Sequence, residues 1–197
     1  MMMFDLLKRS SWPFSKSALK DQADKLLAAA MRGARDPGMY GPGRIPDDFA
    51  GRFDAVALVA TLISARLGDL GPNAQRLNQA FVNALFKSFD DALREDGVGD
   101  LTVPKKMQKI AEAFYGRAAS YRTALEQVDS SDPQGRPALE DAVFRNVLRS
   151  APEAADFSKA LASHVLEIRT LLRGWSMEQM ASAPIEWPPY NHADGTA

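Results

Sequence analysis

The sequence contains no cysteine, which excludes disulfide frameworks, thiolate metal sites and cysteine nucleophiles. Histidine is scarce as well, with only His164 and His192. The 24 basic and 25 acidic residues give a formal net charge of −1, so the chain lacks the strongly basic balance of nucleic-acid-binding proteins. We therefore expect no specific DNA binding, and any electrostatic recognition must be local.

Long apolar runs are also absent. The most apolar stretch, AVALVATLISA at residues 55–65, is much shorter than the roughly 20 residues of a membrane-spanning helix and is typical of a buried helix. The first 14 residues include Asp5, Lys8 and Arg9 and lack the continuous apolar core of a signal peptide. Two interpretations of this segment stay open: a frayed terminus, or a contact with a membrane surface.

Familiar catalytic motifs are missing. The sequence has no Glu-x-x-His pair of the kind that binds two metal ions in helical bundles, and no Gly-x-Ser-x-Gly elbow. The GVGD stretch lacks the Gly-Lys-Ser/Thr order of a phosphate loop. His164 and Glu167 form His-x-x-Glu, which fits a hydrogen-bonded core histidine better than a ligand or proton-transfer group, although a haem-binding bundle could use one such histidine. We expect neither catalysis nor a metal site nor a cofactor.

Helical periodicity dominates what is present, and no alternating stretch is long enough to predict a sheet. The predicted fold is an all-α, single-domain bundle of five to seven helices, with a flexible segment at 1–16, the helical domain at 17–182 and a proline-containing tail at 183–197. Helices are expected at about 17–32, 48–67 and 139–148. A third helix should begin after Asn73 and end before Gly97, and a fourth should start near Thr102 with an apolar stripe that reaches Leu125. A long helix should follow SAPE with apolar residues from Phe157 to Trp175, and SMEQMASA predicts a further short one. The second should be the central helix, because its apolar residues recur at steps of four and three with others beside them.

Several residues are typical of helix ends. We expect Asn73 to cap the third helix, and Gly97 to end it in a left-handed conformation. Ser150 and Glu153 have the spacing of a capping box before the last long helix. Trp187 and Tyr190 could pin part of the tail to the domain.

The charges in REDGVGDLTVPKKMQKIAEAFYGR, residues 94–117, oppose the helix dipoles. Acidic residues end one helix, and Lys105 and Lys106 begin the next, although a helix favours the reverse at both ends. Two explanations stay open. The acidic and basic side chains could pair across the turn, or Lys105, Lys106 and Lys109 could form a basic edge that meets an acidic partner, RNA phosphates or lipid headgroups.

The same residues carry a family resemblance. GRFD at residues 51–54, then LREDGVGDLTVPKKMQKIAEAFYGR at residues 93–117, then the continuation at 121–125, resemble the ubiquinol-cytochrome c chaperone family in order and spacing. The similarity covers residues 17–175. It implies an all-helical, non-catalytic assembly factor for ubiquinol-cytochrome c reductase, respiratory complex III.

The resemblance also implies partners. Mitochondrial members of the family bind newly made cytochrome b together with a small partner protein and associate with the ribosome. Because the chain shows no transit peptide, we expect a bacterial, cytoplasmic relative that can lie peripheral to the inner membrane.

Seven residues of the matching motifs are expected to form the binding site for cytochrome b. Five should edge a docking surface, namely Asp100, Lys105, Lys106, Tyr115 and Arg117. Arg52 and Asp54 should orient the central helix beneath or beside that surface. The first alternative is a helical protein that holds a lipid, a quinone or haem in an apolar pocket. The second is an enzyme that uses His164 with a nearby carboxylate.

Overall fold

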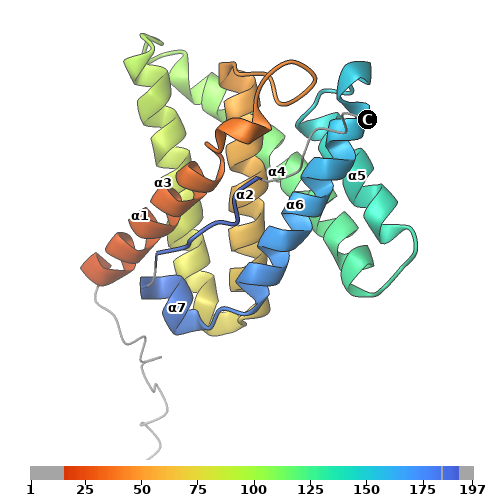
Figure 1. Cartoon of the computed structure of the whole chain (residues 1–197). Coiled ribbons are helices and arrows are strands. Elements are labelled where there is room, and N and C mark those ends of the chain that lie inside the picture. The colour runs from red at the N-terminus through yellow and green to blue at the C-terminus, as the bar shows by residue number, and fades with distance from the viewer. Residues whose placement is uncertain (1–15, 183, 191–197) are drawn as a thin grey trace, which may run out of the picture.

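A computed structural model of the chain describes residues 16–182 and 184–190, and it contains no strand among them. The predicted all-α bundle is confirmed (Figure 1). The described residues form seven α-helices and two 3-10 helices: α1 (Lys16–Gly33), η1 (Pro37–Met39), α2 (Phe49–Asp69), α3 (Pro72–Glu95), α4 (Val103–Asp129), α5 (Gly135–Asn146), η2 (Pro152–Ala154), α6 (Ala155–Arg173) and α7 (Met177–Ser182). None of these helices is both long enough and apolar enough to span a bilayer.

Helix α2 lies at the centre of the bundle, as its sequence predicts. It packs against α1, α3, α4 and α6 (Figure 1). Every residue from 54 to 63 is buried, so the helix is enclosed on all sides rather than on one face. Burying one large aliphatic side chain contributes roughly 1.5–3 kcal/mol, so α2 dominates the hydrophobic stabilisation of the fold.

The flanking helices bury one stripe each. On α3 the buried stripe has four-residue spacing and consists of Leu77, Phe81, Leu85, Phe89 and Leu93. On α4 the buried side chains include Phe114, Tyr121 and Leu125. Helix α5 packs between α4 and α6 and closes the side of the bundle that α1 and α3 do not cover.

Two of the expected caps were wrong and one was right. Gly97 has φ 79°, which confirms the left-handed turn after α3. Helix α3 is preceded by Gly71, with φ 83°, and Pro72 already occupies its first turn, so Asn73 lies inside the helix and caps nothing. Ser150 has φ 57° and Pro152 starts the 3-10 helix η2, so the chain turns before α6 and the Ser150–Glu153 box does not form.

The C-terminal segment 184–190 runs back across the bundle and contacts α1 (Figure 1). The indole nitrogen of Trp187 donates a 2.8 Å hydrogen bond to the carbonyl oxygen of Ala29. The backbone nitrogen of Tyr190 donates a 2.9 Å hydrogen bond to the carboxylate of Asp36. The expectation that these two aromatic residues pin the segment is confirmed, whereas the N-terminal segment 1–15 and His192 lie outside the described residues.

Gly51, at the start of α2, packs so closely that no side chain fits. A Cβ atom on this residue would lie 2.0 Å from the carbonyl oxygen of Pro46. We predict that Gly51→Ala lowers the free energy of unfolding by about 2 kcal/mol, since overpacking a core typically costs 1–3 kcal/mol. Gly68→Ala in the same helix is the control, because a Cβ there meets no atom within 4 Å. Urea denaturation should show the control at or slightly above the stability of the unchanged protein, and equal effects of the two substitutions would contradict the steric explanation.

Candidate functional site

A buried ion-pair network lies at the first turns of α2. The side chain of Asp54 is only 2 % exposed, and its Oδ1 lies 2.9 Å from Nη2 of Arg117 on α4. Its Oδ2 lies 3.7 Å from Nε of Arg149, in the connection between α5 and η2. One carboxylate therefore ties α2 to two segments that are distant in sequence.

Arg149 connects this network to the N-terminal cap of α2. The guanidinium of Arg149 donates two hydrogen bonds to the carboxylate of Asp48 in a bidentate pair, from Nη2 at 2.8 Å and from Nη1 at 3.1 Å. Asp48 also accepts a 2.7 Å hydrogen bond from the backbone nitrogen of Gly51, which caps the helix. These hydrogen bonds, the one from Arg149 first, lower the pKa of Asp48 to about 2.

Burial has the opposite effect on Asp54. Loss of hydration raises its pKa from the ordinary 3.8 to about 6, even though the charges of Arg117 and Arg149 act in the other direction. The phenol of Tyr121 lies in the same buried region, and burial together with the charge of Asp54 raises its pKa. The network is therefore a strongly desolvated polar site inside an otherwise apolar bundle.

An aromatic cluster extends from this network to the surface of α4. It consists of Phe53, Phe86, Phe89, Phe114 and Tyr115. Phe53 contacts Phe89 with ring centroids 5.2 Å apart, and Phe86 stacks on Tyr115 at 5.8 Å. The guanidinium of Arg117 lies 5.4 Å above the Phe53 ring. Tyr115 is 56% exposed, so the cluster ends at the solvent.

An apolar groove of about 790 Å³ lies beside the cluster, between the end of α1, the start of α2 and the end of α3. We define the apolar groove by its lining residues, which are Met31, Ala34, Arg35, Pro37, Tyr40, Gly41, Asp47, Phe49, Arg52, Phe53, Val56, Ser88, Phe89 and Ala92. Phe49 is 60% exposed at its rim. Arg52 and Asp47 also stand there, joined by a 2.8 Å ion pair.

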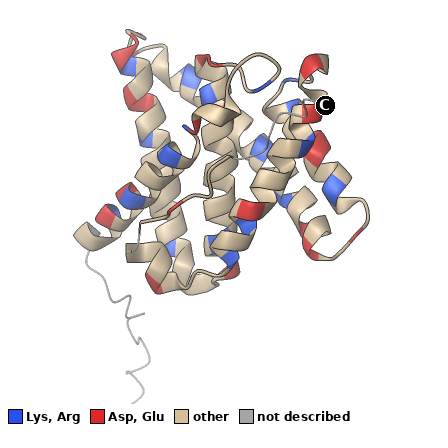
Figure 2. Cartoon of the chain, in the orientation of Figure 1, with Lys and Arg blue, Asp and Glu red and all other residues tan. Residues whose placement is uncertain are grey.

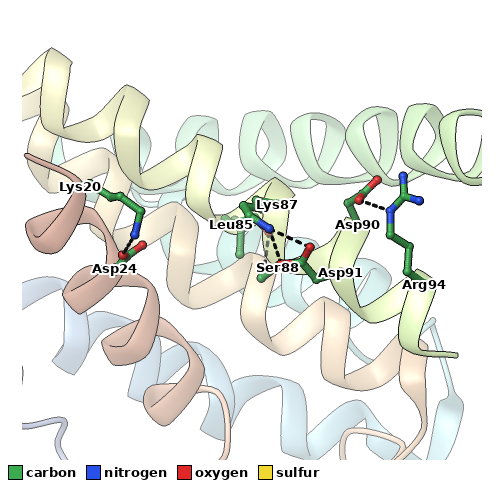
Figure 3. Close-up of polar contacts among 8 residues, drawn as sticks. All are labelled: Lys20, Asp24, Leu85, Lys87, Ser88, Asp90, Asp91 and Arg94. Atoms are coloured by element: carbon green, nitrogen blue, oxygen red, sulfur yellow. Dashed lines mark hydrogen bonds and ion pairs between the residues drawn. The ribbon is translucent and has the colours of Figure 1, made fainter. Parts of the chain in front are cut away.

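The α3–α4 turn does not pair its charges as we first considered. The acidic residues of α3 are held by bases of the same helix, Asp91 by Lys87 at 2.7 Å and Asp90 by Arg94 at 2.6 Å (Figure 3). Arg94 also contacts Asp100 in the turn. Within residues 16–182 and 184–190, no carboxylate forms an ion pair with Lys105 or Lys106. Charges of both signs stand at this end of the bundle (Figure 2), and pairing across the turn does not account for the two lysines.

The seven predicted docking residues fall into three places. Arg52 lines the apolar groove, and Asp54 and Arg117 form the buried pair beneath it. Tyr115 ends the aromatic cluster. Asp100, Lys105 and Lys106 are exposed at the α3–α4 turn.

Sequence reasoning missed Arg149 and Phe49. Arg149 follows a short helix in a part of the chain without a distinctive motif, and no spacing connects it to Asp54. Phe49 has the spacing of a buried residue of α2, yet it lies in the first turn of that helix and is exposed at the rim of the groove.

His164 is a core residue, as its position beside an apolar stripe indicates. It is 2% exposed. Its Nδ1 lies 3.5 Å from Oε2 of Glu167, and its ring meets Tyr190 edge-on at 5.3 Å. These contacts give the histidine a structural role in holding the C-terminal segment.

Comparison with known proteins relates the chain to one family. The family model described as "Ubiquinol-cytochrome C chaperone" matches residues 43–187. A solved structure, described as the crystal structure of the Cbp3 homolog from Brucella abortus, is 30% identical in sequence, with a TM-score of 0.75. The similarity covers 90% of this chain and 94% of that chain. No curated protein matches the chain.

Arg117 should be essential for stability. We predict that Arg117→Ala lowers the free energy of unfolding by about 3 kcal/mol, because it leaves the Asp54 carboxyl without its closest cation. Arg122→Ala on the same helix is the control, since Arg122 is exposed and its nearest carboxylate oxygen, on Glu126, is 3.8 Å away. Denaturation curves should place the control within about 0.5 kcal/mol of the unchanged protein. If both variants lost the same free energy of unfolding, the buried ion pair would contribute no more to stability than the exposed one.

The raised pKa of Asp54 predicts a pH dependence. Because its pKa is 3.8 when unfolded and about 6 when folded, the folded state binds the proton more tightly. The stability that this group contributes is therefore fully present below pH 3.8 and is lost as the pH rises to about 6. Asp54→Asn has no such titration. In urea titrations, the unfolding free energy of the unchanged protein minus that of Asp54→Asn should decrease as the pH rises from 3.8 to about 6. An increase over the same interval would contradict the raised pKa.

Proposed function

The chain belongs to the ubiquinol-cytochrome c chaperone family and is an assembly chaperone of respiratory complex III, and we propose that its client is newly made cytochrome b. We also propose that the protein is bacterial and acts on the cytoplasmic side of the inner membrane, peripheral to it. It would act without catalysis and without a cofactor of its own. A small partner protein and the ribosome are further candidate contacts.

One observation supports this proposal most directly. Among the described residues, three large apolar side chains are exposed: Phe49 at 60%, Leu101 at 98% and Tyr115 at 56%. They stand at the start of α2, in the α3–α4 turn and on α4, next to the predicted docking residues. Exposed apolar side chains beside unpaired charge are typical of protein-binding surfaces. A chaperone for a membrane protein needs such a surface, because its client presents apolar segments before lipid covers them.

We propose that the docking surface comprises Arg52, Asp100, Lys105, Lys106 and Tyr115, with Asp54 and Arg117 beneath it. The lysines open α4 against its dipole, and no carboxylate among the described residues pairs with them. A client with an acidic or polar loop would supply the missing countercharge. The buried pair would hold α2 and α4 in the relative position that the surface requires.

A second candidate function follows from the apolar groove. Its volume of about 790 Å³ is within the range of small-molecule sites, so the groove could hold a lipid, a quinone or haem. Purified protein with a Soret band or an extractable lipid would favour this alternative.

The test uses the source organism without this gene. We predict that loss of the gene reduces complex III activity and haem-stained cytochrome b, and that the unchanged gene restores both. The double variant Lys105→Glu/Lys106→Glu should fold normally and restore neither, because charge reversal repels the countercharge of the client.

The control is Lys20→Glu/Lys25→Glu in the first half of α1, which makes the same charge change and should restore complex III. Normal cytochrome b in the deletion strain would refute the proposed function. Full rescue by the α4 variant would refute only the role of the two lysines.

A further inference from the structure

The floor of the apolar groove is aromatic, and its walls come from α1, α2, α3 and the connection between α1 and α2. Phe53 and Phe89 meet with ring centroids 5.2 Å apart, one from α2 and one from α3. Met31 of α1, Ala34 just after that helix and Val56 of α2 add further apolar lining. An apolar groove with a volume of about 790 Å³ has room for several apolar side chains from one face of a helix.

The rim of the apolar groove contains an exposed aromatic side chain, Phe49. Phe49 is 60% exposed although it stands at the first turn of the most buried helix of the bundle. Aromatic side chains, including Phe, are enriched in protein interfaces relative to the rest of the surface. At the rim of the groove, Phe49 can therefore make apolar contact with a bound segment.

Two acidic residues extend the α3 wall. Ser88 and Ala92 line the groove, and Glu95 and Asp96 follow Ala92 by three and four residues, so helical spacing places both on the groove side. Both are exposed, and in the part of the chain that the structure describes neither forms an ion pair. They stand at the C-terminal end of α3, where the dipole disfavours negative charge and favours a cation.

The basic residues of the rim do not supply that cation. Arg52 is held by Asp47 at 2.8 Å. Arg35 follows the last turn of α1, where its positive charge is favoured by the dipole of α1 itself. The α3 wall thus combines apolar contact with a negative end that the described chain does not neutralise.

We propose that the apolar groove binds the cytoplasmic end of a transmembrane helix of the client, with apolar side chains over Phe53 and Phe89 and with flanking Lys or Arg residues against Glu95 and Asp96. Cytoplasmic ends of transmembrane helices have an excess of Lys and Arg, which gives this occupant both required properties. The inference rests on the proposed function and adds the class of segment that is recognised and its direction in the groove.

The test uses the full chain and two labelled peptides, each with ten Leu and Ala residues followed by three Lys or by three Glu. Fluorescence anisotropy should show that the Lys peptide binds at least tenfold more tightly than the Glu peptide, and that salt weakens its binding. Glu95→Lys/Asp96→Lys should reverse this preference. Ala92→Trp, which fills the groove, should abolish binding of both peptides while thermal melting shows an intact fold.

Asp21→Lys/Glu178→Lys is the control, because it makes the same charge change on α1 and α7 and should leave the peptide preference unchanged. Equal binding of both peptides would overturn the inference, as would competition by spermine, which carries positive charge without an apolar helix. Binding that survives Ala92→Trp would place the peptide elsewhere and overturn it too.

Failure of this inference is distinguishable from failure of the proposed function. If the peptides do not bind but the deletion strain loses cytochrome b, the groove is rejected and the chaperone role stands. If the Lys peptide binds but cytochrome b is normal in the deletion strain, the groove recognises apolar helices with basic ends and the client is another protein.

Discussion

The carboxylate of Asp54, enclosed between Arg117 and Arg149, is the interaction on which the arrangement of this bundle depends. A buried carboxylate is costly without its cations, so α4 and the connection after α5 are constrained to approach the first turns of α2. Arg149 extends the constraint to the helix cap through Asp48. Phe53, which precedes Asp54 in α2, lines the apolar groove and belongs to the aromatic cluster, so this desolvated ion pair fixes the helix that contributes to both.

Much of the fold could be predicted because helical periodicity reports burial directly. The four-residue stripe of α3 predicted a helix with one buried face, and the apolar run at residues 55–65 predicted that α2 lies at the centre. Caps were less predictable, since Pro72 and Pro152 start helical turns where Asn73 and Ser150 were expected to cap them. Arg149 was beyond prediction, because four α-helices separate it in sequence from its partner Asp48 and only tertiary packing brings the two together.

At the α3–α4 turn, the sequence predicted where the charges are unfavourable but not which of them form ion pairs. The pattern identified a segment whose charges are unfavourable for its own helices, and it left two explanations open. Distances in the structure exclude pairing across the turn. Asp90 and Asp91 form ion pairs within α3, whereas Glu95, Asp96, Lys105 and Lys106 form none among the described residues. The contact with a partner stays a prediction. Side-chain geometry determines which charges remain unpaired, and this geometry cannot be read from the sequence alone.

The C-terminal segment has a consequence for the order in which the molecule becomes complete during synthesis. Asp36, which caps η1, is held by Tyr190, and α1 is held by Trp187, so one wall of the groove is supported by the last described residues of the chain. Contacts between residues this far apart in sequence form late and slow folding. The residues up to Tyr190 must therefore have left the ribosome before the groove wall has its full support.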